Sequence, residues 1–282
     1  MGYLDEIKNI EEEPYNNFTV IMGKPGSGKT TVAGTYPKPM LVITIGNDGG
    51  AVVLKHYGDD VDTLNLKSDE VTEPQAKHVG MKLIDTIKEL RGNNKYKTIV
   101  IDAYSSVEEE ILTFISDKKG GKGVTLNERG SIMNFMVKVR DNIIINSKSN
   151  IEYIAIVHVK QSNDTDNISG ETNTNLIPKM TLNNGNILLE RASNVMYCAR
   201  KTVSENGENV VKFLTYIGPH PYIDTKIRFV DDRKLESGIY IKDGTFDKIL
   251  SIKNSGVDDN DKVEIVESSN PFEEKQNKEE DF

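Results

Sequence analysis

The sequence predicts an α/β protein: a mostly parallel sheet flanked by helices, with antiparallel strands at its C-terminal edge and a disordered acidic tail. Three observations support this. Apolar runs of strand length alternate with segments of helical spacing, which indicates parallel strands joined by crossover helices. A glycine-rich octet, GKPGSGKT, stands between the first apolar run and the first helical segment. The last thirty residues hold ten acidic residues against four lysines, a composition typical of disordered segments.

The elements follow in order along the chain. Continuous apolar runs, typical of strands buried on both faces, occupy residues 18–22, 40–45, 97–104 and 151–159. Helices are expected at residues 29–35, 73–93, 106–117 and 127–145. The second of these has apolar residues at helical spacing and closes at a glycine, with Val79, Leu83, Ile84, Ile87, Leu90 and Gly92. A polar stretch at 160–179 is expected to be a long loop, and the runs 192–201, 210–218 and 225–230 to be the antiparallel edge strands.

Charge and composition divide the chain into an N-terminal segment (1–14), one domain (15–252) and the tail (253–282). The net charge is −9, and the tail accounts for −6 of it, so the other residues carry only −3. A nearly neutral domain can present a local basic groove, so a nucleic-acid partner is not excluded. No apolar run reaches the length of a membrane span, and the single cysteine, Cys198, rules out a disulfide within the chain. These features predict a cytoplasmic protein without membrane contact.

The octet fits G-x-x-x-x-G-K-[ST], the phosphate-binding loop, and its position between a strand and a helix is the context that this motif requires. Its backbone amides would surround phosphate oxygens, Lys29 would contact the β- and γ-phosphates, and the Thr30 hydroxyl would be a ligand of Mg²⁺. The sequence therefore predicts a site for ATP and Mg²⁺. Its nucleotide-binding residues are Gly23, Lys24, Pro25, Gly26, Ser27, Gly28, Lys29, Thr30 and Thr31.

A second magnesium ligand, Asp102, is expected at the end of the apolar run Thr98–Ile101. A carboxylate in that place is costly unless it is paired or bound to a metal. Asp102 could also cap the helix that follows, and the two roles are compatible. The metal site would then consist of Thr30 and Asp102.

Hydrolysis also needs a group that activates water. Ala103 occupies the place directly after Asp102, where one branch of P-loop enzymes has a glutamate, and Glu108 comes only later. Asp48, after the second strand, is the favoured carboxylate, with an ordinary Asp-Gly turn as the alternative. His158 and Gln161, at the end of a core strand, could sense the γ-phosphate, and His158 could equally be an ordinary strand-end histidine.

Several segments together resemble a known family. They are GKPGSGKTTVAGTYPKPMLVIT, GNDGG, KTIVIDAYSSVEEEI, RGSIMNFMVKVRDNI, YIAIVHVKQ, SNVMYCARK and TKIRFVDDR. In order and spacing they resemble phage-encoded RecA-like P-loop ATPases of the Sak single-strand annealing type, which are phage AAA-family ATP-binding proteins. The family has a glutamate where this chain has the shorter Asp48.

The resemblance implies a RecA-like core and a DNA-dependent ATPase that binds single-stranded DNA and promotes annealing or strand pairing during recombination. It also implies a homo-oligomer, a ring or a filament, in which basic residues reach the γ-phosphate of a neighbouring subunit. The matching residues are Lys226, Arg228 and Arg233, and Arg228 is the expected catalytic one. Asp48, Lys29 and Asp102 complete the expected catalytic set.

The DNA-binding residues are expected in loops after the late core strands. The resemblance assigns them to residues 160–180, which Lys160 and Lys179 bracket. A second candidate is the loop with Lys118, Lys119 and Lys122, for which a solvated helix connection is the alternative. The tail ends in NPFEEKQNKEEDF and is similar to the docking tips of bacterial single-strand-binding proteins. It could bind such a partner, cover the DNA groove of its own chain, or act only as a solubilising tail.

Three other functions remain as alternatives. A metabolic kinase would need a lid with several arginines, and the seven arginines of this chain are scattered. An AAA+-type helicase loader or remodelling ATPase would need an Asp-Glu pair where Asp102 and Ala103 stand. A nucleotide-gated interaction module with little turnover stays open because Asp48 is short.

Overall fold

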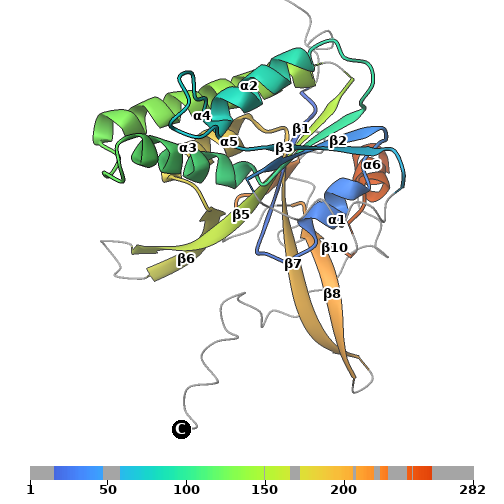
Figure 1. Ribbon diagram of the computed structural model, residues 1–282. Helices are drawn as coiled ribbons and strands as arrows, with labels where there is room; N and C mark the ends of the chain where they lie inside the picture. The colour runs from blue at the N-terminus through green and yellow to red at the C-terminus, as the bar shows by residue number, and fades with distance from the viewer. Residues whose placement is uncertain are drawn as a thin grey trace, which may run out of the picture.

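The computed structural model describes residues 16–46, 58–148, 150–165, 172–205, 208–218, 223–227, 240–242 and 244–255. Within these ranges ten strands form one sheet (Figure 1). The strands are β1 (Phe18–Gly23), β2 (Met40–Ile45), β3 (Val61–Leu66), β4 (Thr98–Asp102), β5 (Glu152–Thr165), β6 (Thr172–Pro178), β7 (Asn194–Glu205), β8 (Glu208–Tyr216), β9 (Lys226–Ile227) and β10 (Tyr240–Lys242).

The middle of the sheet is parallel and its later strands are antiparallel. The order is β10-β8-β7-β1-β5-β4-β2-β3, and β6 and β9 pair with β5 and β7. All pairs from β7 to β3 are parallel, whereas β8, β9, β10 and β6 pair antiparallel. Strand β5 lies between β1, which leads into the glycine-rich octet, and β4, which ends in Asp102. The predicted mostly parallel sheet with antiparallel C-terminal strands is confirmed.

Helices cover both faces of this sheet. Helices α2 (Val79–Glu89), α3 (Tyr104–Lys118), α4 (Leu126–Ser147) and α5 (Leu182–Arg191) lie on one side, and α1 (Lys29–Gly34) and α6 (Phe246–Ser255) on the other (Figure 1). Alternate residues of β1 pack against the helices on opposite faces of the sheet, because successive strand side chains point to opposite faces. Phe18, Val20 and Met22 join the larger apolar cluster, while Ile21 packs with Val32 of α1.

The expected helix at 73–93 is observed as the shorter α2. Its five predicted apolar positions are all buried, which confirms the helical spacing. The chain before it is not helical because His78 is the N-cap, and its imidazole Nδ1 accepts a hydrogen bond from the Met81 amide at 3.3 Å. Capping by the side chain thus fixes where the helix begins.

The long polar loop expected at 160–179 is wrong for most of its length. Strand β5 continues to Thr165 and pairs antiparallel with β6, so these residues form a β-hairpin, whose residues 166–171 lie outside the described ranges. The sequence misses it because the exposed strands of a projecting hairpin need no apolar face. Strands β3 and β10 and helices α5 and α6 were not predicted either. Helix α6 ends at Ser255, so it includes the first residues of the expected tail, and the rest of the tail lies outside the described residues.

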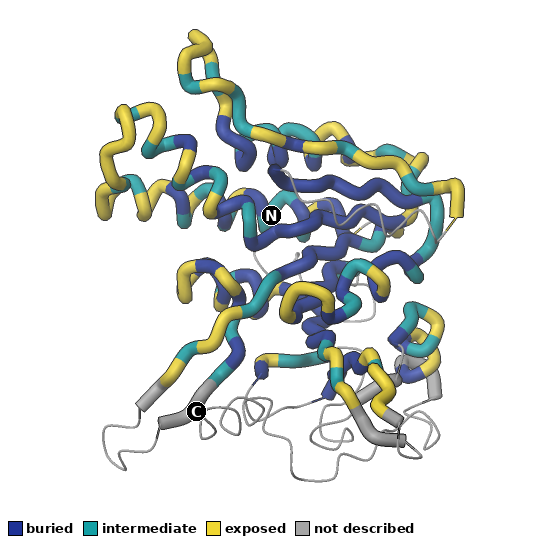
Figure 2. Tube along the Cα trace, turned by 60° about the horizontal axis from the view of Figure 1, so that its bottom comes forward, coloured by how far each residue is buried: buried dark blue, intermediate teal, exposed yellow. Residues whose placement is uncertain are grey.

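Two hairpins project from the sheet at the carboxyl ends of its parallel strands. Strand β1 ends at Gly23, which lies beside His158 of β5 and Cys198 of β7. Both neighbours continue past that level, β5 to Thr165 and β7 to Glu205. The hairpins β5–β6 and β7–β8 therefore extend beyond the end of β1, and Figure 1 shows them pointing away from the helices. Figure 2 shows their outer parts as exposed or intermediate, in contrast to the buried strands of the sheet.

None of the described helices is both long enough and apolar enough to cross a membrane.

Candidate nucleotide-binding site

The glycine-rich octet turns tightly between β1 and α1, and its glycines are needed for that shape. A Cβ on Gly23 would lie 2.5 Å from the carbonyl oxygen of Cys198 on β7, so only glycine fits this close approach. Gly26 and Gly28 have φ angles of 72° and 89°, a left-handed conformation that glycine adopts without steric cost. The loop therefore has the backbone conformation of a phosphate cradle.

Lys29 and Ser27 provide polar groups inside this loop. The Lys29 side chain is buried, and its Nζ donates a hydrogen bond to the Lys24 carbonyl oxygen across the loop at 2.8 Å. The Ser27 Oγ is also buried and has no hydrogen-bond partner among the described residues. A buried hydroxyl without a partner is costly. The loop therefore fits a polar ligand such as the phosphates of a nucleotide.

Thr30 and Asp102 meet at the ends of α1 and β4. The Thr30 hydroxyl donates to Asp102 Oδ2 at 3.2 Å, although the two residues are 72 positions apart. Asp102 is buried, and Thr30 is half-buried. A hydroxyl and a carboxylate that converge beside a phosphate loop are oxygen ligands of the kind that Mg²⁺ prefers. These two residues could hold the metal ion as the sequence predicts.

His158 lies at the level of this site, and Gln161 lies on the hairpin. His158 pairs in register with Gly23, and its amide donates to the Ser105 Oγ at 3.1 Å, which ties β5 to the start of α3. Gln161 is three residues further along β5, opposite Leu176 of β6, and is exposed. His158 is thus placed near the loop, whereas Gln161 belongs to the base of the hairpin.

Asp48, the expected water-activating residue, lies outside the described residues. Gly46 is the last described position before it, and a Cβ there would lie 2.9 Å from Glu110 Oε1 on α3. Glu110 therefore brings a carboxylate next to Gly46, at the end of the described part of this segment. Sequence reasoning missed it, because VEEEIL reads as the solvated face of a helix. Glu108 has a different role: its Oε2 accepts the Thr181 amide at 2.9 Å and anchors the start of α5.

Of the three candidates for action on a neighbouring subunit, Lys226 lies within the described residues. Lys226 on β9 pairs with Val195, which itself pairs with Val20, so it lies well before the glycine loop along the strands. Its Nζ donates to the Glu190 carbonyl oxygen at 3.0 Å. Arg228 and Arg233 lie outside the described residues. Within its own chain, Lys226 is thus not at the phosphate loop.

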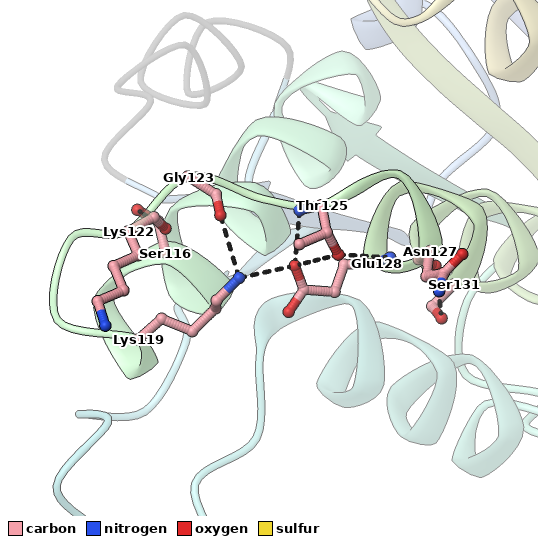
Figure 3. A network of polar contacts seen from close by, with 8 residues as sticks. All are labelled: Ser116, Lys119, Lys122, Gly123, Thr125, Asn127, Glu128 and Ser131. Atoms are coloured by element: carbon pink, nitrogen blue, oxygen red, sulfur yellow. Dashed lines mark hydrogen bonds and ion pairs between the residues drawn. The ribbon is translucent and has the colours of Figure 1, made fainter.

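The lysines of the α3–α4 connection differ in their surroundings (Figure 3). Lys119 Nζ donates to the Gly123 carbonyl oxygen at 3.1 Å and to Glu128 Oε2 at 3.0 Å. Glu128 also accepts the Thr125 amide at 2.7 Å in the capping box of α4. Lys119 therefore holds the connection together, while Lys118 and Lys122 have exposed side chains.

This network predicts an acid-sensitive contribution to stability. The Thr125 amide, the Lys119 ammonium and the Thr125 hydroxyl lower the pKa of Glu128 from 4.5 to about 2. A carboxyl whose pKa is lower in the folded state stabilises the protein above its unfolded pKa, and the stabilisation is lost as the pH falls through the folded pKa. We expect Glu128→Gln to lower the melting temperature at pH 7, by a margin that shrinks between pH 4.5 and pH 2. Thermal unfolding of both proteins checks this, and Glu109→Gln, on exposed α3 surface, is the control. A margin independent of pH would contradict it.

The lysines that bracket the β5–β6 hairpin are both exposed at its base. Lys160 Nζ donates to the Met180 carbonyl oxygen at 2.8 Å. Lys179 lies 3.9 Å from Glu109 Oε2, a solvent-exposed pair of the kind that contributes little to stability. Lys179 is therefore the more available of the two for another anion.

One residue at the loop, Phe213 of β8, could not be found from the sequence. A Cβ on Gly28 would lie 3.2 Å from its ring, although Phe213 is 185 positions away in the chain. Cys198 of β7 pairs with Thr215 of β8 and is buried. Burial raises the pKa of its thiol to about 11, so the thiol remains neutral. Of these two residues, Phe213 is exposed to solvent and Cys198 is not.

The chain was compared with known structures, curated sequences and protein families. A solved structure of a KaiC-like protein from the hyperthermophilic archaeon Pyrococcus horikoshii OT3 aligns with a TM-score of 0.39 and 13% identity, over 70% of this chain and 77% of that chain. No curated protein sequence matches the chain. The family described as AAA domain matches residues 16–229, more than half of the chain. This chain therefore belongs to the AAA domain family.

Proposed function

We propose that this protein is a DNA-dependent ATPase that binds single-stranded DNA and promotes annealing or strand pairing in phage recombination. The P-loop, the Thr30–Asp102 pair and the family support the ATP site. The observation that carries the DNA part is the path of β5. It leaves the sheet beside the P-loop and continues, without a break, into the hairpin that replaces the expected DNA loop.

At the ATP site, different residues bind the phosphates, hold the metal ion and activate the water. Lys29 is placed to bind the phosphates, and Thr30 and Asp102 to hold Mg²⁺, which when bound would neutralise phosphate charge. Asp48 orients and deprotonates the attacking water, and Glu110, whose carboxylate lies beside Gly46, is the second candidate for this role. Interactions that are stronger in the transition state than with bound ATP are the ones that raise turnover.

The link between ATP and DNA runs through β5. His158 lies beside Gly23, and the hairpin starts directly after it, so a shift of His158 towards bound phosphate moves the base of the hairpin. The exposed polar side chains of this strand, Gln161 and Asn163, can form hydrogen bonds to a DNA backbone. Lys160 and Lys179 add positive charge at the base.

We further propose a ring or filament of identical subunits. Lys226 is remote from its own P-loop, which fits a basic element that acts on a neighbouring subunit together with Arg228 and Arg233.

The acidic tail, 253–282, is proposed to dock on a single-strand-binding protein. Deleting residues 256–282 leaves α6 whole and tests that docking.

The test is steady-state ATP hydrolysis by the full chain with Mg²⁺, with single-stranded DNA, with duplex DNA and without DNA. We expect single-stranded DNA to raise turnover, and the stimulation to fall between about 50 and about 200 mM salt because binding releases counterions. Turnover that is indifferent to DNA at both salt concentrations would overturn the DNA part and favour a nucleotide-gated interaction module.

Two charge-changing variants locate the DNA surface. Asn163→Asp adds a negative charge to the β5–β6 hairpin, and Lys122→Glu reverses a charge on the α3–α4 connection. We expect the first to reduce stimulation by DNA while basal turnover stays unchanged, and the second to have no effect on either. The reverse result would move the DNA surface to the α3–α4 connection.

A further inference from the structure

Phe213 is an exposed aromatic residue in contact with the P-loop. Its side chain is 41% exposed, and its ring would lie 3.2 Å from a Cβ on Gly28, the N-cap of α1. One side of the ring therefore rests on the loop and the rest faces solvent. Large aromatic side chains are usually covered, because burying them is strongly favourable. An uncovered ring at a nucleotide loop suggests that a ligand completes its packing.

The β7–β8 pairing fixes which side chains share this face with Phe213. Phe213 is opposite Arg200, and Thr215 is opposite Cys198. Directly opposed residues of an antiparallel pair point to the same face, with their Cβ atoms about 5 Å apart. Cys198 packs in the apolar cluster with Val32 and Ala33 of α1. The face with Phe213 and Arg200 is therefore the one that looks towards α1 and the P-loop.

Arg200 adds a positive charge to that face. It is exposed and lies two residues beyond Cys198, the residue whose carbonyl oxygen approaches Gly23. Arginine combines a planar cation with five donors, which suits both phosphate oxygens and aromatic rings. The hairpin thus presents an apolar ring and a guanidinium side by side next to the loop.

We propose that the β7–β8 hairpin is one wall of the nucleotide pocket, in which Phe213 stacks on the nucleobase and Arg200 contacts the phosphates. This rests on the proposed ATP site and adds the residues that recognise the base. Every base has an aromatic face, so stacking on Phe213 accepts ATP and GTP alike. The hairpin then gains packing when nucleotide binds.

A purely structural role for Phe213 makes a different prediction. If the ring only supports Gly28, its loss disturbs the phosphate loop itself and weakens every phosphate ligand equally. If the ring stacks on the base, its loss weakens nucleotides and spares a ligand that has no base. Inorganic tripolyphosphate is such a ligand, and it separates the two roles.

The experiment is calorimetric titration of the full chain with Mg²⁺ and ATP, GTP or tripolyphosphate. For Phe213→Ala we expect affinity for ATP and for GTP to fall by about tenfold or more, with tripolyphosphate unchanged. The control is Val210→Ala, an exposed apolar position three residues away, whose side chain points to the opposite face of the hairpin. Equal losses for ATP and tripolyphosphate, or no loss for either, would overturn the role of Phe213. Absence of ATP binding to the unmodified protein would instead overturn the ATP site.

Two more variants test the geometry. The chain contains no tryptophan, so Phe213→Trp places a single indole at the site, and ATP should quench its fluorescence while tripolyphosphate should not. Arg200→Ala should weaken ATP and tripolyphosphate together, since its contact is to phosphate, and Arg200→Lys should restore part of both. Quenching by tripolyphosphate as strong as by ATP would contradict base stacking, and an Arg200→Ala protein that binds both ligands normally would remove Arg200 from the proposal.

Discussion

Replacing Lys29 by methionine is expected to abolish nucleotide binding and to reduce ATP turnover by about a hundredfold or more. The ammonium is buried in the P-loop and donates to the Lys24 carbonyl oxygen, so it is fixed where the phosphates would enter. Methionine is also unbranched and is one atom shorter, so it keeps most of the packing while it removes the charge and the donors of the ammonium. ATP binding by calorimetry and steady-state hydrolysis measure the effect.

Lys24→Ala is the matched control for this variant. Lys24 lies in the same loop, its side chain is exposed, and the hydrogen bond from Lys29 uses its backbone carbonyl, which alanine retains. We expect normal binding and turnover, because Lys24 would contribute to nucleotide binding through its backbone, which alanine keeps. The melting temperature of the ligand-free Lys29→Met protein should not fall, because an apolar group replaces a buried charge. Full ATP affinity in the Lys29→Met protein would disprove the P-loop assignment.

Asp102→Asn is expected to reduce Mg²⁺-dependent turnover by about a hundredfold or more, because it removes a charge from the metal site. The amide has the same shape as the carboxylate and can still accept from Thr30, which now donates to Oδ2 at 3.2 Å. The fold should therefore persist while the dependence of ATP binding on Mg²⁺ is weakened. Titrating ATP with and without Mg²⁺ separates the metal from the nucleotide.

Asp48→Asn should behave differently, with turnover lost while Mg²⁺-dependent ATP binding persists. Glu110→Gln is its comparison, since Glu110 Oε1 lies against Gly46, two residues before Asp48 in the sequence. If Asp48→Asn hydrolyses ATP normally and Glu110→Gln does not, the water-activating carboxylate is Glu110. Normal Mg²⁺ dependence in the Asp102→Asn protein would exclude Asp102 as a metal ligand.

The parallel core could be predicted because its signals are local. Strands buried on both faces must be apolar throughout, which is why 18–22, 40–45 and 97–104 stand out in the sequence. The amphipathic α2 is equally clear, since one face must be apolar to cover the sheet. The P-loop is recognisable because its shape needs glycine where φ is positive, at Gly26 and Gly28.

The β5–β6 hairpin and β3 could not be predicted, because their stability depends on pairing with strands that the sequence does not identify. Half-exposed or projecting strands need no apolar pattern, and backbone hydrogen bonds to a partner define them. Helix α5 also depends on a distant residue, because Glu108 of α3 accepts a hydrogen bond from the Thr181 amide at its start.

By itself, the sequence determined the fold class, the phosphate loop and a carboxylate at the end of β4, because glycine conformation and strand burial leave direct marks on residue type. The tertiary structure decided which distant residues meet. It placed Thr30 against Asp102, Glu110 against Gly46, and Phe213 against Gly28. Such contacts depend on strand order and register, which follow from the packing of the whole sheet and from no single segment.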